Sequence, residues 1–113
     1  MLLTGDYHTH TKYSHGGGVR HGKGTVLQNV LKAKELGLKE IAITDHGFEQ
    51  MAWGLKRKEF PQLIQDCREA AKVTGLSVYV GMEANLCDGN GRTDMLESDY
   101  PDFDIFLMGI HRF

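Results

Sequence analysis

Four short apolar segments constrain the fold of this 113-residue chain more than any other feature of its sequence. Each is too short for a stable helix, and each is flanked by polar residues or glycine, as strands are. The four predicted strands are Leu2–Tyr7, Glu40–Thr44, Ser77–Gly81 and Ile105–Met108. Helix-patterned segments separate the first three of them. Because strands that alternate with helices pair in parallel, the sequence predicts an α/β fold built from βα units.

The helices between these strands are recognised by how they begin and end. The first is predicted at Val26–Leu36, with Thr25 as its N-cap and Gly37 as the left-handed residue beyond its end. The second begins near Pro61, which fits the first turn of a helix, and is closed by Gly75.

Two turn dipeptides follow the third predicted strand. Asp88-Gly89 and Asn90-Gly91 both favour reverse turns. We therefore expect Glu83–Leu86 and Arg92–Met95 to pair as a small hairpin.

The spacing of the units indicates how much of a barrel they form. Four units in 113 residues average about 28 residues each, and a complete (β/α)8 barrel of ~250 residues averages about 31. A chain of this length forms one domain. The sequence therefore predicts an incomplete (β/α) barrel, roughly the amino-terminal half.

Composition excludes several classes of protein. Hydrophobic residues make up 41% of the chain and charged residues 25%, as in ordinary packed domains. The net charge of −2 provides no basis for nonspecific binding to nucleic acid or to an anionic membrane. No apolar run reaches the ~18 residues of a membrane span, and the first residues do not resemble a signal peptide. We expect a cytoplasmic protein in which Cys67 and Cys87 are free thiols.

Every predicted strand runs into residues that can bind metal. The first is followed by His8 and His10, the second by Asp45 and His46, the third by Glu83, and the fourth by His111. Functional residues of parallel α/β folds collect at the carboxyl ends of the strands. Residues i and i+2 of an extended segment also point to the same side, so His8 and His10 can bind one ion together. The pattern predicts a metal site.

Four of the candidate residues have alternative roles. His15 and His21 lie in a glycine-rich loop, where each is either a ligand or a solvated side chain. Asp45 is either a turn residue or a carboxylate that supports a ligand through a hydrogen bond, and the sequence favours the second. Glu83 is either a surface carboxylate or a bridge between two cations. Mixed imidazole and carboxylate ligation favours Zn, Mn or Fe over Ca.

These motifs together resemble those of the PHP (polymerase and histidinol phosphatase) family, over essentially the whole chain. The motifs that carry the resemblance are His8-Thr9-His10-Thr11, Ile43-Thr44-Asp45-His46-Gly47, Gly81-Met82-Glu83-Ala84-Asn85 and Gly109-Ile110-His111. The resemblance implies a distorted seven-stranded, TIM-like barrel with two or three divalent transition metals at the carboxyl ends of its strands. It also implies hydrolysis of phosphate esters.

Carried onto this chain, the resemblance implies which residues would bind each metal. His8, His10 and Glu83 would hold one metal, Glu83 would bridge to a second metal shared with His111, and His46 with a loop histidine would hold a third. Either His15 or His21 fits the position of the loop histidine.

The family pattern continues with a further histidine and an Asp-x-His, for which this sequence has no counterpart. We therefore expect residues 1–113 to be the amino-terminal portion of a PHP-type domain, with an exposed edge strand at Ile105–Met108 that favours self-association. The predicted function is that of a metal-dependent phosphoesterase acting on a small phosphorylated metabolite, similar to histidinol phosphatase, with Glu83 and Asp45 as catalytic-site residues. This portion alone is expected to be inactive or weakly active. Two alternatives are a metal-binding or proofreading module of a DNA polymerase and a degenerate scaffold that binds nothing.

Overall fold

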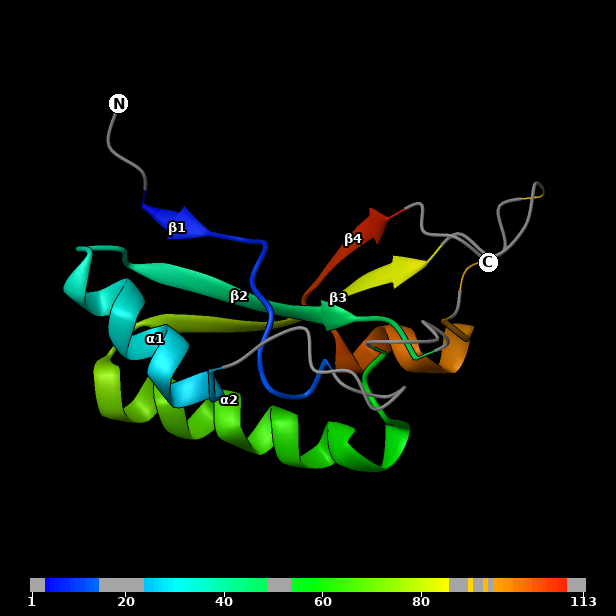
Figure 1. Ribbon diagram of the computed structural model, residues 1–113, viewed down its shortest axis with the longest axis horizontal. Coiled ribbons are helices and arrows are strands. Elements are labelled where there is room, and N and C mark those ends of the chain that lie inside the picture. The colour runs from blue at the N-terminus through cyan, green and yellow to red at the C-terminus, as the bar shows by residue number, and fades with distance from the viewer. Residues whose placement is uncertain are drawn as a thin grey trace.

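The computed structural model describes residues 4–14, 24–48, 54–85, 90, 93 and 95–109. Within them, four parallel strands form one sheet in the order β1-β2-β3-β4. The strands are β1 (Gly5–Asp6), β2 (Glu40–His46), β3 (Ser77–Asn85) and β4 (Ile105–Gly109). The sheet curls along its width (Figure 1). The predicted architecture, an incomplete α/β barrel, is confirmed.

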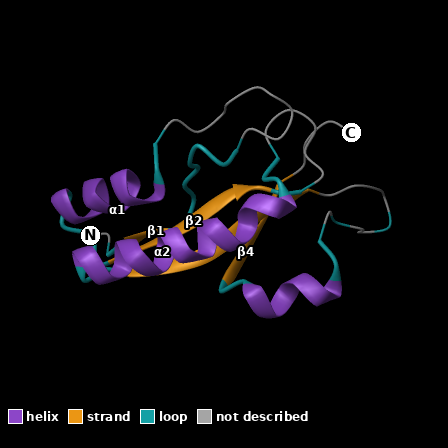
Figure 2. Cartoon of the chain, turned by 90° about the horizontal axis from the view of Figure 1, so that it is seen from below, coloured by secondary structure: helices purple, strands orange, loops and turns teal. Residues whose placement is uncertain are grey.

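Two helices, α1 (Val26–Glu35) and α2 (Phe60–Thr74), cover one side of this sheet (Figures 1 and 2). Both begin and end much as predicted. Thr25 caps α1 in a reciprocal pair of hydrogen bonds with Gln28. Gly37 and Gly75 take positive φ angles of 81° and 77° just beyond the two helices, a conformation that glycine adopts without strain.

The core lies between the helices and the sheet. Val30 of α1 and Leu63 and Cys67 of α2 are buried against Ile43 of β2 and Met82 of β3. Cys67 is a free thiol, as predicted, and its burial raises its pKa to about 12. Cys87 lies outside the described residues. No helix in the described part of the chain is both long and apolar enough to cross a membrane.

The central strands are longer than predicted. β2 continues through Asp45 and His46, and β3 continues through Asn85. The predicted hairpin is wrong at Glu83, because this residue pairs with parallel strands on both sides, opposite His46 and Leu107. Residues 86–89, 91, 92 and 94 of that prediction lie outside the described residues.

The connection into β4 contains a 3-10 helix, Glu97–Asp102, that the sequence did not predict. A second 3-10 helix, Arg57–Glu59, leads into α2. The two are joined by a forked ion pair, in which the guanidinium of Arg57 donates to both carboxylate oxygens of Asp99 over 2.9 and 3.2 Å. This ion pair, together with Phe60 stacked on Phe103 at 4.6 Å between ring centroids, holds the β4 connection against the start of α2.

Gly81 allows β3 to approach both of its neighbours closely. A Cβ atom at this position would lie 2.6 Å from Cγ2 of Ile105 and 2.8 Å from Cγ2 of Thr44. We expect Gly81→Ala to lower the free energy of unfolding by about 1–3 kcal/mol, since overpacking forces neighbouring strands apart. Urea denaturation measures the change.

Gly24→Ala is the matched control for this prediction. The added Cβ at Gly24 would also lie 2.6 Å from an atom, but that atom is Oδ1 at the end of the Asn29 side chain, which can turn away. We expect a loss of less than about 1 kcal/mol, because only the Asn29 amide and its one hydrogen bond to the carbonyl of His10 must adjust. Equal losses in the two variants would contradict the account of Gly81.

Candidate metal centre

The carboxyl ends of β2 and β3 place an imidazole beside a carboxylate. His46 is the last residue of β2 and lies opposite Glu83 of β3 in the parallel register. Paired residues of neighbouring strands point to the same face of a sheet, so the two side chains meet. The distance between Nδ1 of His46 and Oε2 of Glu83 is 3.5 Å.

His8 and His10 reach the same place on a chain segment that continues β1 beyond Asp6. This segment is fastened to β2 at Thr9. The carbonyl of Thr9 accepts a hydrogen bond from the backbone N–H of Thr44 at 2.9 Å. The backbone N–H of Thr9 donates to Oγ1 of Thr44 at 3.0 Å. The hydroxyl of Thr9 donates to the carbonyl of Ala42 at 2.7 Å. The residue between the two histidines is therefore fixed to the strand that carries His46.

One oxygen of Glu83 is the centre of the cluster. Nε2 of His8 lies 3.1 Å from Oε2, and Nε2 of His10 lies 3.2 Å from it. The rings of His10 and His46 stack with their centroids 4.4 Å apart and an angle of 7° between their planes. His8 meets His10 edge to face at 5.1 Å. Three imidazoles thus surround one carboxylate oxygen.

The cluster is closed on one side and open on the other. Only 3% of the His46 side chain is exposed, against 56% of the His8 side chain. The open side of the cluster is therefore the side of His8. Burial raises the pKa of Glu83, but the hydrogen bond from His8 and the nearby charges of His46, His8 and His10 outweigh burial and leave the pKa below its ordinary value. Glu83 is ionised at neutral pH.

The arrangement fits a bound divalent metal. Ligand atoms of His8, His10 and Glu83 all lie within 4.8 Å of one another. Two ligands at ~2.0–2.1 Å from a tetrahedral zinc ion stand about 3.3 Å apart, close to the separations found around Oε2 of Glu83. Neutral imidazole and carboxylate are ligands that suit Zn, Mn and Fe. His46 lies beside this set.

The remaining candidate ligands lie outside the described residues. These are His15 and His21 in the glycine-rich loop and His111 beyond β4. β4 ends at Gly109, which pairs with Asn85, so it reaches the same edge of the sheet as the end of β3.

Asp45 takes a position different from the one expected for a carboxylate that holds an imidazole. Its Oδ1 accepts from the N–H of Thr11 and the hydroxyl of Ser14, each at 2.6 Å, and its Oδ2 accepts from the hydroxyl of Thr11 at 2.8 Å. Burial raises the pKa of Asp45, and these hydrogen bonds oppose the rise. Asp45 thus holds the chain that follows His10.

Sequence reasoning missed the hydroxyl groups that hold the cluster in place, those of Thr9, Thr11, Ser14 and Thr44. Threonine and serine are common in turns and at strand ends. Nothing in their spacing alone distinguishes a hydroxyl that anchors a neighbouring strand from one that faces water.

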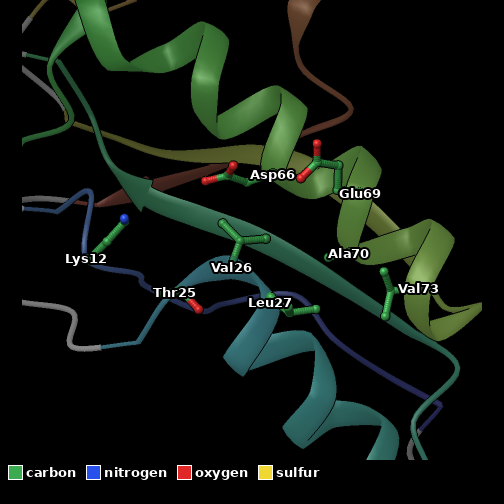
Figure 3. A pocket seen from close by; sticks show the side chains of 8 residues that line it. All are labelled: Lys12, Thr25, Val26, Leu27, Asp66, Glu69, Ala70 and Val73. Carbon is green, nitrogen blue, oxygen red and sulfur yellow. The ribbon is translucent and has the colours of Figure 1, made fainter.

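A separate pocket of about 280 Å³ lies between α1 and α2 (Figure 3). Apolar side chains of both helices line it together with Asp66, Glu69 and Lys12. Asp66 already accepts hydrogen bonds from Tyr13 at 2.6 Å and from Gln62 at 2.8 Å. Glu69 accepts one from Gln65 at 3.2 Å. None of the four residues of the cluster lines this pocket.

Comparison with known proteins agrees with the geometry. The family model of the PHP domain matches residues 6–113. The chain belongs to the PHP domain family. The predicted resemblance is therefore confirmed, and all four residues of the cluster lie within the matched range.

Curated relatives carry a name that describes an activity. A protein of Caldicellulosiruptor saccharolyticus named "Probable phosphatase" is 35% identical over 111 residues, which is 98% of this chain and 43% of the relative. Proteins with similar names from Caldanaerobacter subterraneus and Shewanella loihica are 35% and 32% identical, over 98% of this chain and 40% and 41% of their own lengths. The PHP-domain chain thus spans about two fifths of the length of these relatives.

Proposed function

We propose that this chain carries the amino-terminal metal-binding part of a metal-dependent phosphoesterase. The observation that carries the proposal is the convergence of His8, His10 and His46 on one oxygen of Glu83 at the carboxyl edge of the sheet. Membership of the PHP domain family and the naming of relatives as probable phosphatases support it. A metal cluster and a phosphate ester are the proposed cofactor and substrate class.

Each candidate ligand has a proposed place. His8, His10 and Glu83 would hold the first ion. A carboxylate has two oxygens, so Glu83 could also serve a second ion, for which His111 would be the further ligand. His46 with either His15 or His21 would hold a third. Zn, Mn and Fe all suit these nitrogen and oxygen donors.

A bound metal supplies a Lewis acid for a phosphoryl oxygen and lowers the pKa of its bound water. The protein groups have separate tasks. Glu83 stays ionised, because imidazoles surround it, and so keeps its oxygen available as a ligand. The buried ring of His46 stacks on that of His10 and excludes water from that side of the cluster. The exposed side of His8 leaves the entrance for substrate.

The proposed dependence on metal follows from the charges in the cluster. Its four side chains are three imidazoles and one carboxylate, with no lysine or arginine among them. A phosphate ester is an anion, and with its imidazoles neutral, the form in which they bind metal, the cluster carries the charge of Glu83 and would repel the ester or bind it weakly. Bound divalent ions reverse the sign of the local charge. A small phosphorylated metabolite, as for histidinol phosphatase, is the proposed substrate class.

The test compares the chain with and without added metal. We expect inorganic phosphate to bind in equilibrium dialysis only after Zn²⁺ or Mn²⁺ has been added. Hydrolysis of p-nitrophenyl phosphate is expected to be weak, to rise with the metal and to stop on chelation. The chain spans only part of its relatives, so the rate is expected to lie well below an ordinary kcat of ~10 s⁻¹. Phosphate binding that is unchanged by chelation would contradict the proposal.

A further inference from the structure

Asp45, Thr11 and Ser14 form a buried group on the helix side of the end of β2, and we name them the Asp45 clamp. We propose that the Asp45 clamp is a positioning device that sets His10 against His46. This inference rests on the proposed metal-binding function and goes beyond it, because no member of the clamp lies in the cluster of candidate ligands. Thr11 and Asp45 would each act through the histidine beside it in the chain, and Ser14 through its hydrogen bonds to Asp45 and His46.

The clamp is closed and fully hydrogen-bonded. All three of its side chains are buried. The carboxylate of Asp45 accepts three hydrogen bonds from the other two residues, at 2.6, 2.6 and 2.8 Å. A buried carboxylate is costly unless its oxygens are satisfied, and donors to an ionised group form strong bonds. The Thr11–Ser14 segment is therefore held firmly to β2.

The clamp joins the two histidines through the backbone. Thr11 directly follows His10, and Asp45 directly precedes His46. The hydroxyl of Ser14 donates to Asp45 and accepts from the backbone N–H of His46 at 3.2 Å. The hydroxyl of Ser14 thus contacts both of the last two residues of β2.

Alternation along the strand explains why the clamp can act without touching the metal. Successive residues of a strand point to opposite faces of the sheet. Asp45 therefore faces the side covered by the helices, and His46 faces the other side. The chain after β1 crosses β2 from the side of β1 to the side of the helices (Figure 1). Thr9 is anchored to Thr44, and Thr11 is anchored to Asp45. His10 is thus held on both sides.

A contact from α1 completes the support. The side-chain amide of Asn29 donates to the carbonyl of His10 at 2.9 Å. The backbone of His10 is therefore fixed by a helix as well as by its neighbours. The clamp fixes the position of the segment that follows His10, from Thr11 to Ser14. A shift there would separate the rings of His10 and His46, which are stacked at 4.4 Å.

The first test measures cobalt binding by visible absorption, with Co²⁺ as the probe. Thr11→Val and Asp45→Asn are expected to weaken the affinity by about 10-fold or more, as is usual when an outer partner of a ligand is lost. They are also expected to change the intensity of the absorption bands. Thr11→Ser retains the hydroxyl and is expected to restore both.

Thr74→Val is the matched control. Thr74 is also buried, and its hydroxyl donates to the carbonyl of Ala70 at 2.7 Å in α2, away from the cluster. This variant loses a buried hydroxyl and some stability, but cobalt affinity is expected to stay that of the unchanged chain. Equal affinities in Thr11→Val and Thr74→Val would overturn the clamp. Complete loss of binding in Asp45→Asn, matching His10→Ala, would also overturn it, because Asp45 would then be a ligand.

A second readout needs no metal. The imidazole signals of His10 and His46 in long-range ¹H–¹⁵N spectra of the metal-free chain are expected to shift in Thr11→Val and Ser14→Ala, and to stay in place in Thr74→Val. Absence of cobalt binding in the unchanged chain would defeat the proposed function, while these spectra would still test the clamp. Unshifted signals in both clamp variants would overturn the clamp alone.

Discussion

Replacing Glu83 with glutamine is expected to lower the affinity for Zn²⁺ or Mn²⁺ by more than about 100-fold, beyond the loss usual for an outer partner of a ligand. Glu83 provides the one oxygen on which His8, His10 and His46 converge, at 3.1–3.5 Å. An amide is of nearly the same size but carries no charge, and its NH₂ group cannot bind a cation. Elemental analysis of the purified variants, followed by metal titration, measures the effect.

Glu40→Gln is the matched control for Glu83→Gln. Glu40 is the first residue of β2, at the opposite end of the strand from His46. It accepts hydrogen bonds from the phenols of Tyr7 and Tyr79, and these bonds lower its pKa. Both variants therefore neutralise a hydrogen-bonded carboxylate of the sheet. We expect metal binding to be unchanged in Glu40→Gln. Similar losses in both variants would show that a general change in the sheet, and not a lost ligand, explains the first result.

The part of the site carried by strand ends could be predicted from the sequence. Once β2 and β3 are expected to be parallel neighbours, the carboxyl end of each lies at the same edge. His46 and Glu83 must then lie close together. The His8-x-His10 spacing likewise requires both rings to point the same way if the chain is extended, and the anchor at Thr9 keeps it so. Both results follow from backbone geometry, which the pattern of strands and the spacing of residues along the sequence are enough to predict.

The side-chain contacts of Asp45 could not be predicted. The sequence placed Asp45 next to a ligand and suggested that it holds an imidazole, but its oxygens face Thr11 and Ser14. Which face a residue takes at the end of a strand depends on how far the strand continues. The predicted strand stopped at Thr44, and the structure extends it by two residues. This extension places Asp45 on the helix side and His46 on the other.

The hairpin prediction is wrong at Glu83 for a related reason. Asp-Gly and Asn-Gly dipeptides favour a tight turn, but a hairpin also needs an unpaired strand edge beside the turn. Glu83 has β2 on one side and β4 on the other, so its backbone has no edge left for an antiparallel partner. Strand order in the sheet is a long-range property, and local turn signals carry no information about it.

The chain is expected to associate with a second copy of itself through β4. Among the described strands β4 lies at one edge of the sheet, and it contains no charged residue that would block pairing. Its apolar side chains are also poorly covered. Phe106 is 42% exposed and Met108 is 64% exposed. We expect two β4 strands to pair antiparallel about a two-fold axis, since a strand that meets its own copy in this way forms a closed dimer.

Helix coverage explains why this edge is the one that associates. Phe106 lies opposite Met82 in the register, on the same face of the sheet, and Met82 is fully buried in the core with α1 and α2. The cover is less complete over β4: Phe106 stays 42% exposed beside the rings of Tyr100 and Phe103, whose centroids lie 5.5 and 5.4 Å from its own. Pairing of two copies would remove both the open backbone edge and part of this apolar surface from water.

Sedimentation velocity over a ~100-fold range of concentration tests the association. We expect Met108→Lys to weaken it by at least ~10-fold, because a charge on an edge strand opposes pairing with another chain. Leu36→Lys is the matched control, since Leu36 is 65% exposed at the end of α1, away from β4. It adds the same charge and removes a similarly exposed apolar side chain, so association should be unchanged. A monomer at every concentration, or equal effects of the two lysines, would show that the β4 edge does not pair.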